Sequence, residues 1–116
     1  MLDNVMKDIN AAKYAELRRI KQDHGETYAS IHEAYGVLAE EMHEAELEYV
    51  CAKDFFADLI ESIHQGRKTM IDSDLEAVEG YALKAACELV QVAAVCRKAL
   101  EGMARREEAY ALEASE

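Results

Sequence analysis

The chain has 116 residues and a formal net charge of −11, from 24 acidic and 13 basic residues. This balance argues against nucleic-acid phosphate or an anionic membrane surface as the main partner, because no excess of positive charge attracts either. An acidic surface is compatible with the binding of divalent cations. No run of uncharged apolar residues approaches the roughly 20 that a bilayer-spanning helix needs, so we expect no membrane association.

The composition predicts an all-α protein. The chain contains no proline and 5 glycines, and it is rich in alanine, glutamate and leucine, which favour helix. Its length predicts a single domain over residues 1–116.

The cysteines and the N-terminus favour a cytoplasmic protein. Cys51, Cys87 and Cys96 are odd in number and form no CxxC pair. We therefore expect small, reduced, apolar side chains rather than disulfides or zinc ligands. The N-terminus shows no signal-peptide pattern.

Two breaks divide the chain into three predicted helices. The breaks are DHGE at residues 23–26 and QGRK at residues 65–68. The first helix is predicted from about Leu2 to Asp23, with Gly25 as its stop.

The second helix is predicted to begin between Thr27 and Ser30 and to continue to His64. Ser30 and Glu33 have the spacing of a capping box, and Thr27 is an equally good N-cap. The apolar positions of this helix alternate spacings of four and three, which is a heptad pattern. They are Ile31, Tyr35, Leu38, Met42, Ala45, Tyr49, Ala52, Phe56, Leu59 and Ile63.

The third helix is predicted to begin at Ser73, with Glu76 at capping-box spacing. Its apolar positions also alternate four and three, and many of them are small, so a facing helix can come close. They are Leu75, Val78, Ala82, Ala85, Leu89, Val92, Cys96, Ala99 and Met103. Residues 107–116 keep helical propensity but lose this pattern, and we expect them to fray.

The predicted architecture is three antiparallel helices, two of them long. The short first helix cannot cover the apolar faces of both long ones. We therefore expect the chain to assemble with itself into a helical bundle, as a homodimer or a higher oligomer.

The stretch HEAYGVLAEEMHEAELEY at residues 32–49 holds six glutamates and no lysine or arginine. Glu41 and Glu44 border the predicted heptad seam, and Glu40 forms a row with Glu44 at i, i+4 spacing. Like charges at that spacing repel. A bound Mg²⁺ would reverse this effect, because hard divalent ions take oxygen ligands.

Glu88 on the third helix has the same relation to its own seam as Glu41. It lies in the apolar segment AACELVQVAAVC, where burying a carboxylate without a partner is costly. Lys84, one turn earlier, offers a structural explanation as a helical ion pair with Glu88. From the residues alone, the ion pair and the metal ligand both stay open.

The segment HGETYASIHEAYGVLAEEMHEAELE resembles the opening of the MazG-like all-α nucleotide pyrophosphohydrolases. In that family, a turn containing HG precedes a helix with the motif LxEExxE, which residues 38–44 match. The later ELVQVAAVCRKALE is similar to the second motif region of short phage-encoded relatives. The resemblance covers about residues 21–48 and 81–101.

The resemblance implies that a nucleoside triphosphate is cleaved to the monophosphate and pyrophosphate. It places Mg²⁺, or Mn²⁺, on Glu41, Glu44 and Glu88, which would be the catalytic residues. Glu40 would be an extra metal ligand, or a hydrogen-bond acceptor just outside the ligands that contact the metal. Gln91 stands where the family has Asp; an amide oxygen can coordinate a metal, but it brings no charge and cannot act as a base.

Substrate phosphates would be bound mainly through the metal, because the chain has no glycine-rich phosphate loop. Lys84, Arg97 or Lys98 would assist, and Lys84 is the predicted substrate-binding residue. The two motifs are further apart than is usual in the family.

The residues also allow two alternatives to an enzyme. Glu40-x-x-His43 and Glu61-x-x-His64 have the ExxH spacing of di-iron bundles, but they lie on one predicted helix about 31 Å apart. One monomer therefore cannot bring them together. The stronger alternative is a non-catalytic helical dimer that acts as an interaction or regulatory module, with its glutamates serving solubility.

Overall fold

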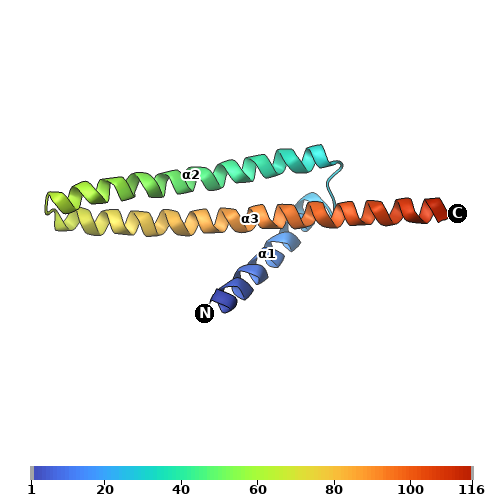
Figure 1. The fold of residues 1–116 in the computed structure, drawn as a ribbon, viewed down its shortest axis with the longest axis horizontal. Coiled ribbons are helices and arrows are strands. Elements are labelled where there is room, and N and C mark those ends of the chain that lie inside the picture. Colours follow the sequence, from blue (N-terminus) through green and yellow to red (C-terminus); the bar gives the residue numbers. More distant parts are fainter. Residues whose placement is uncertain (1, 116) are drawn as a thin grey trace. The chain divides into compact units, whose positions relative to one another are not determined.

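The computed structural model describes residues 2–115, which fold into three α-helices. These are α1 (Leu2–His24), α2 (Ile31–His64) and α3 (Lys68–Ser115), shown in Figure 1. The all-α prediction and both predicted breaks between helices are confirmed. Within the described residues, none of the helices has the length and apolarity required to span a membrane.

Two glycines end the first two helices. Gly25 and Gly66 have positive φ values of 91° and 65°, a conformation that glycine adopts without a Cβ clash. The Gly25 N–H donates to the Lys21 carbonyl at 2.9 Å, and the Gly66 N–H donates to the Ile63 carbonyl at 3.1 Å. These bonds satisfy carbonyl groups in the last turns of α1 and α2.

The start of α2 agrees with one of the two predicted caps, and the start of α3 differs from its prediction. The Glu33 N–H donates to the Ser30 hydroxyl at 3.2 Å, so Ser30 is the N-cap. α3 begins at Lys68, which places Ser73 inside the helix, and the predicted start is wrong. The reason is the tight turn at Gly66, after which the Arg67 carbonyl already accepts the Ile71 N–H at 2.9 Å.

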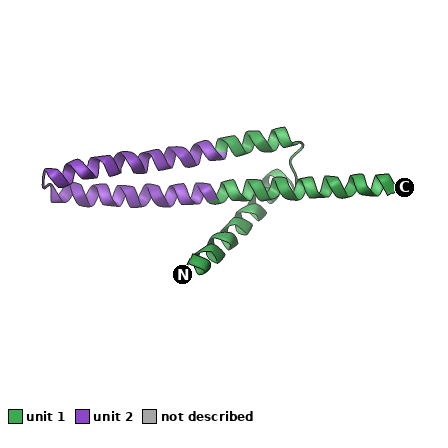
Figure 2. Ribbon diagram, in the orientation of Figure 1, with its two compact units in different colours: residues 1–40, 90–116 green, residues 41–89 purple. Residues whose placement is uncertain are grey.

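The chain divides into two compact units, shown in Figure 2. Unit 1 comprises Met1–Glu40 and Val90–Glu116, and unit 2 comprises Glu41–Leu89. Both α2 and α3 therefore contribute to each unit, whereas α1 belongs to unit 1 alone. The C-terminal residues 107–115 are exposed turns of α3.

The core of unit 1 is small and joins all three helices. Leu17 and Ile20 are the buried residues of α1. They form a cluster with buried residues from the loop, α2 and α3, namely Tyr28, Ala34, Ala94 and Val95. In this unit α1 crosses α3 obliquely (Figure 1), whereas the predicted arrangement of three antiparallel helices would align it with the other two. The alanines allow this close crossing because they add little volume between the helices.

Polar contacts in unit 1 tie α1 and the following loop to α3. The Lys21 ammonium donates to the Glu101 carboxylate at 2.6 Å, and the Arg106 guanidinium donates to the Tyr28 carbonyl at 2.5 Å. Lys98 is buried, with its Nζ 4.1 Å from the centroid of the Tyr28 ring. Burial lowers the pKa of Lys98, an effect that the negative charges of Glu33 and Glu26 oppose.

The contact between Lys21 and Glu101 makes the stability of unit 1 depend on pH. The hydrogen bond from Lys21 holds the pKa of Glu101 below its ordinary value of 4.5. A carboxyl group with a lowered folded-state pKa contributes stability that is present above the unfolded-state pKa and lost as pH falls through the folded-state pKa.

We therefore expect Glu101→Gln to lower the free energy of unfolding at neutral pH. The difference from wild type should shrink as the pH falls through and below 4.5. Urea unfolding across this pH range measures it, with the exposed Glu113→Gln as the matched control. A difference that stays constant in acid would contradict this explanation.

In unit 2, α2 and α3 run antiparallel, side by side (Figure 1). The face that each turns toward the other is buried or half-buried, and its positions alternate spacings of three and four. This buried seam comprises Glu41, Ala45, Glu48, Ala52, Phe55, Leu59 and Ser62 of α2, and Ile71, Asp74, Val78, Tyr81, Ala85 and Glu88 of α3.

Two side-chain contacts define the seam. The rings of Phe55 and Tyr81 stack with centroids 5.6 Å apart and planes 14° apart. Nearer the turn, the buried Ser62 hydroxyl donates to the buried Asp74 carboxylate at 2.8 Å. Because the hydroxyl and the carboxylate are hydrogen-bonded to each other, the seam can include these two buried polar residues.

The predicted seams are correct at alternate positions and wrong at the others. Ala45, Ala52 and Leu59 face α3 as predicted, whereas the remaining α2 positions within unit 2 are exposed. Those positions are Met42 (51%), Tyr49 (58%), Phe56 (55%) and Ile63 (54%). On α3, Leu75 and Leu89 are likewise 50% and 53% exposed. The helices pack through the residue before each of these, so part of the apolar face points outward.

Candidate metal centre

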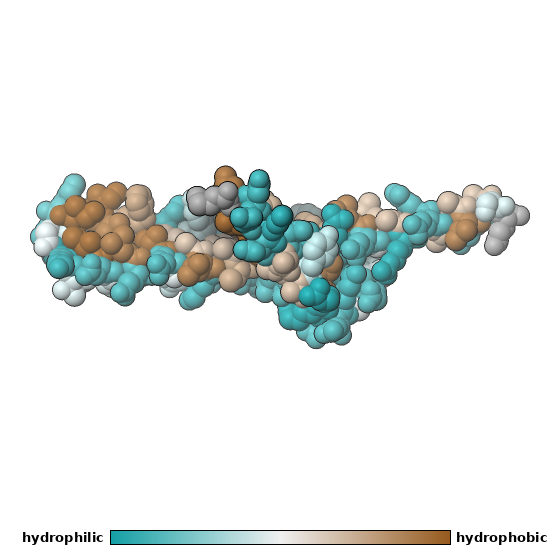
Figure 3. Space-filling model, turned by 90° about the horizontal axis from the view of Figure 1, so that it is seen from below, coloured by the Kyte–Doolittle hydropathy of each residue, from teal (hydrophilic) through white to brown (hydrophobic). Residues whose placement is uncertain are grey.

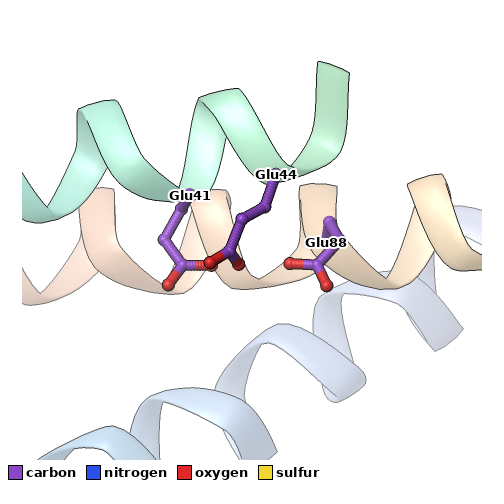
Figure 4. Close-up of side chains that lie close together, drawn as sticks. All are labelled: Glu41, Glu44 and Glu88. Atoms are coloured by element: carbon purple, nitrogen blue, oxygen red, sulfur yellow. The ribbon is translucent and has the colours of Figure 1, made fainter. Parts of the chain in front are cut away.

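Three glutamates of unit 2 come together from two helices. Glu41 and Glu44 lie one turn apart on α2, and Glu88 lies on α3. Figure 4 shows the carboxylates of α2 and α3 gathered on one side of the hairpin. Glu41 and Glu88 belong to the buried seam and are half-buried, whereas Glu44 is exposed beside them.

Carboxylate oxygens of Glu41, Glu44 and Glu88 all lie within 4.8 Å of one another. Among the described residues, no other set of three or more histidines, cysteines or acids forms such a group. The convergence follows from the antiparallel pairing, which sets Glu88 against the α2 turn that carries both other glutamates. These are the three positions that the sequence analysis singled out; their role as metal ligands or catalytic residues stays a prediction.

The group has the chemistry of a site for a hard divalent cation. Mg²⁺ binds oxygens at about 2.1 Å, so two ligands on opposite sides of it are about 4.2 Å apart. The oxygens lie within 4.8 Å of one another, so any adjustment needed to reach this geometry is less than about 1 Å. Carboxylates this close repel one another, and a cation with two positive charges would turn that repulsion into attraction.

The other predicted site residues lie close in sequence to the three glutamates. Glu40 is exposed and is the last α2 residue of unit 1, and Gln91 is half-buried in the part of α3 that belongs to unit 1. Their part in the site stays a prediction. Lys84 is exposed on α3 in unit 2. Its Nζ lies 5.0 Å from the centroid of the Tyr81 ring.

Sequence reasoning missed several residues of the seam that contains Glu41 and Glu88. Phe55, Tyr81 and the half-buried Glu48 face the seam, but none was assigned to it. The sequence does contain a signal for these residues. It is a second heptad row, which runs one residue before the more apolar row. That row mixes acids, aromatic rings and small residues, so its hydrophobicity is weaker although its spacing is equally regular.

Comparison with known proteins assigns no family to the chain. No protein-family model matches it, and no curated protein or solved structure is similar enough to count as a match. The resemblance to the MazG-like proteins therefore rests on the two motif regions, and the case for a function rests on the geometry of the glutamates.

Proposed function

We propose that Glu41, Glu44 and Glu88 bind Mg²⁺ or Mn²⁺, and that the chain is a metal-dependent nucleoside triphosphate pyrophosphohydrolase. The observation that carries this proposal is the convergence of the three carboxylates within 4.8 Å, from two helices. The same three positions match the motif glutamates of the MazG-like family. Three of the residues singled out by the motifs thus also lie together in the fold, and Glu40 is not in that group.

The proposed reaction breaks the bond between the α-phosphorus and the oxygen that bridges it to the β-phosphorus. Water supplies the oxygen that completes the nucleoside monophosphate, and pyrophosphate leaves. A divalent cation would supply charge neutralisation at the phosphates and a lowered pKa for the attacking water.

The three glutamates differ in their surroundings, which suits them to different tasks. Glu41 and Glu88 are half-buried in the seam, where packing restricts their side chains and holds their oxygens in place. Glu44 is exposed, so the site is open to solvent on its side and a triphosphate can approach there. Lys84, one turn before Glu88, adds a positive charge on the same helix for the substrate phosphates.

A titration with metal and nucleotides tests this function. Pyrophosphate release is followed for a panel of nucleoside and deoxynucleoside triphosphates, with Mg²⁺, Mn²⁺ or a chelator. In parallel, the melting temperature is measured with metal alone. We expect metal-dependent turnover of at least one nucleotide and a metal-dependent rise in melting temperature. The absence of both would contradict the proposal.

A non-catalytic interaction module is the second candidate. The observation that favours it is the row of half-exposed apolar residues along unit 2, which catalysis by the glutamates does not require. A protein with this role would associate through that row, and metal would change neither its stability nor its association.

A further inference from the structure

Unit 2 carries a row of large apolar side chains that no part of the described chain covers. Each follows a seam residue by one position along its helix, and each is 50% to 58% exposed. We name these residues the apolar stripe: Met42, Tyr49, Phe56 and Ile63 of α2, with Leu75 and Leu89 of α3. Figure 3 shows apolar side chains gathered over the end of unit 2 that carries the α2–α3 turn.

The two halves of the stripe lie on the same side of the hairpin. A step of one residue turns about 100° around a right-handed helix. Because α2 and α3 run in opposite directions, the same step from each seam points to the same side of the pair. The α2 positions repeat every seven residues, as do Leu75, the small Ala82 and Leu89 of α3.

We infer that a second copy of this chain docks on the apolar stripe through its own stripe, so that two hairpins form a four-helix arrangement. The seven-residue period matches a helical partner, because knobs-into-holes packing requires the same period on both sides. A two-fold axis places the same surface of both copies in contact, so the stripe of each copy meets a stripe with the same seven-residue repeat.

The exposed area of the chain agrees with a missing partner. A globular monomer of 13.0 kDa is expected to expose about 6,300 Å². This chain exposes 8595 Å², an excess of about 2,300 Å². A stable dimer interface covers about 800 Å² on each partner. The excess, which is summed over the whole chain, is larger than this area.

The stripe itself keeps charge out of the proposed contact. The net charge of −11 makes two copies repel one another in general. The stripe itself contains no charged residue, so contact there brings no carboxylates of its own together. Charged side chains stand at its border: Lys53, Glu46 and Glu79 are exposed, and they lie four residues after Tyr49, Met42 and Leu75.

The proposed interface and the exposed Glu44 point to opposite sides of α2, because the two residues from Met42 to Glu44 turn about 200° around the helix. Glu41 and Glu88 lie in the seam, one position before the stripe residues Met42 and Leu89. Dimerisation through the stripe would leave the three carboxylates open in each copy. The inference therefore stands whether or not the chain is an enzyme.

Sedimentation velocity on the full chain at several concentrations tests this inference. We expect the wild type to be a dimer, and Phe56→Glu and Leu89→Glu to raise its dissociation constant by about 30-fold or more, as for central interface residues. The matched controls are Leu47→Glu on α2 and Leu83→Glu on α3. Both control positions are exposed but lie off the stripe, so these variants should remain dimeric.

Circular dichroism shows whether each variant keeps its helices. If a glutamate variant loses helicity, Tyr49→Ser and Leu89→Ser reduce the apolar area without adding charge and should still weaken the dimer. A monomeric wild type would overturn the inference, and so would controls that dissociate as readily as the stripe variants. A stripe that binds a different protein while this chain stays monomeric would also overturn it.

Discussion

Glu88→Gln should reduce metal-dependent pyrophosphate release by about 100-fold or more, because it removes one charged ligand from a site of three. Glutamine has nearly the same shape, so the packing of Glu88 in the seam is largely kept. The amide retains one oxygen but loses the negative charge that attracts the cation. Rates measured at saturating nucleotide over a range of Mg²⁺ concentrations show whether the loss lies in metal affinity or in turnover.

Glu76→Gln is the control for this substitution, since Glu76 is an exposed acid on the same helix and loses the same charge. It should keep the wild-type rate and the wild-type stabilisation by metal. Melting temperatures with Mg²⁺ alone give a second measurement, in which Glu88→Gln should lose the metal-dependent rise. Equal rates for wild type and Glu88→Gln would remove Glu88 from the proposed site.

Leu17→Ala should lower the free energy of unfolding by about 3 kcal/mol, within the range for large-to-small substitutions in a core. Leu17 is 4% exposed and is one of two buried residues on α1. Because α1 has so small a buried face, the cavity removes a large part of what holds this helix in unit 1. Urea unfolding at one fixed protein concentration measures the change, since self-association also alters apparent stability.

Leu2→Ala makes the same substitution on the same helix at a residue that is 80% exposed. It should change the free energy of unfolding by no more than about 0.5 kcal/mol, as for surface positions. Hydrogen exchange adds a local measurement, in which α1 amides should lose protection in Leu17→Ala before those of unit 2. If the two variants were equally stable, the small core of unit 1 would not be what holds α1.

Local sequence signals predicted the helices well because their physical causes are local. Gly25 and Gly66 supply the positive φ that ends a helix, and Ser30 supplies the oxygen that caps the next one. The start of α3 was missed because Ser73 has capping chemistry but follows a turn that had already initiated the helix. A capping residue acts only where the preceding chain has left the helical conformation.

The orientation of α2 and α3 was less predictable because two heptad rows run side by side. Phe55 and Phe56 are adjacent and equally apolar, and Phe55 is the one that turns inward, where it stacks on Tyr81. Hydrophobicity favoured the row of Phe56, and contact across the hairpin favours the row of Phe55. Glu41, Glu44 and Glu88 could still be singled out, because Glu41 and Glu88 border the predicted seam and lie in the observed one, with Glu44 exposed beside them.

The hydrogen bond between Ser62 and Asp74 determines more than the packing beside it. The seam carries alanines at Ala45, Ala52 and Ala85, and helices that meet at such small residues can slide past one another more easily than helices joined by large ones. A slide by one heptad would leave the buried Asp74 without its donor, a loss that costs about 1–3 kcal/mol. It would also carry Glu88 about 10 Å along α2, away from Glu41 and Glu44. The Ser62 hydroxyl near the α2–α3 turn thus sets the alignment of the two helices. Any joint action of Glu41, Glu44 and Glu88, which lie far along the hairpin from Ser62, depends on that alignment.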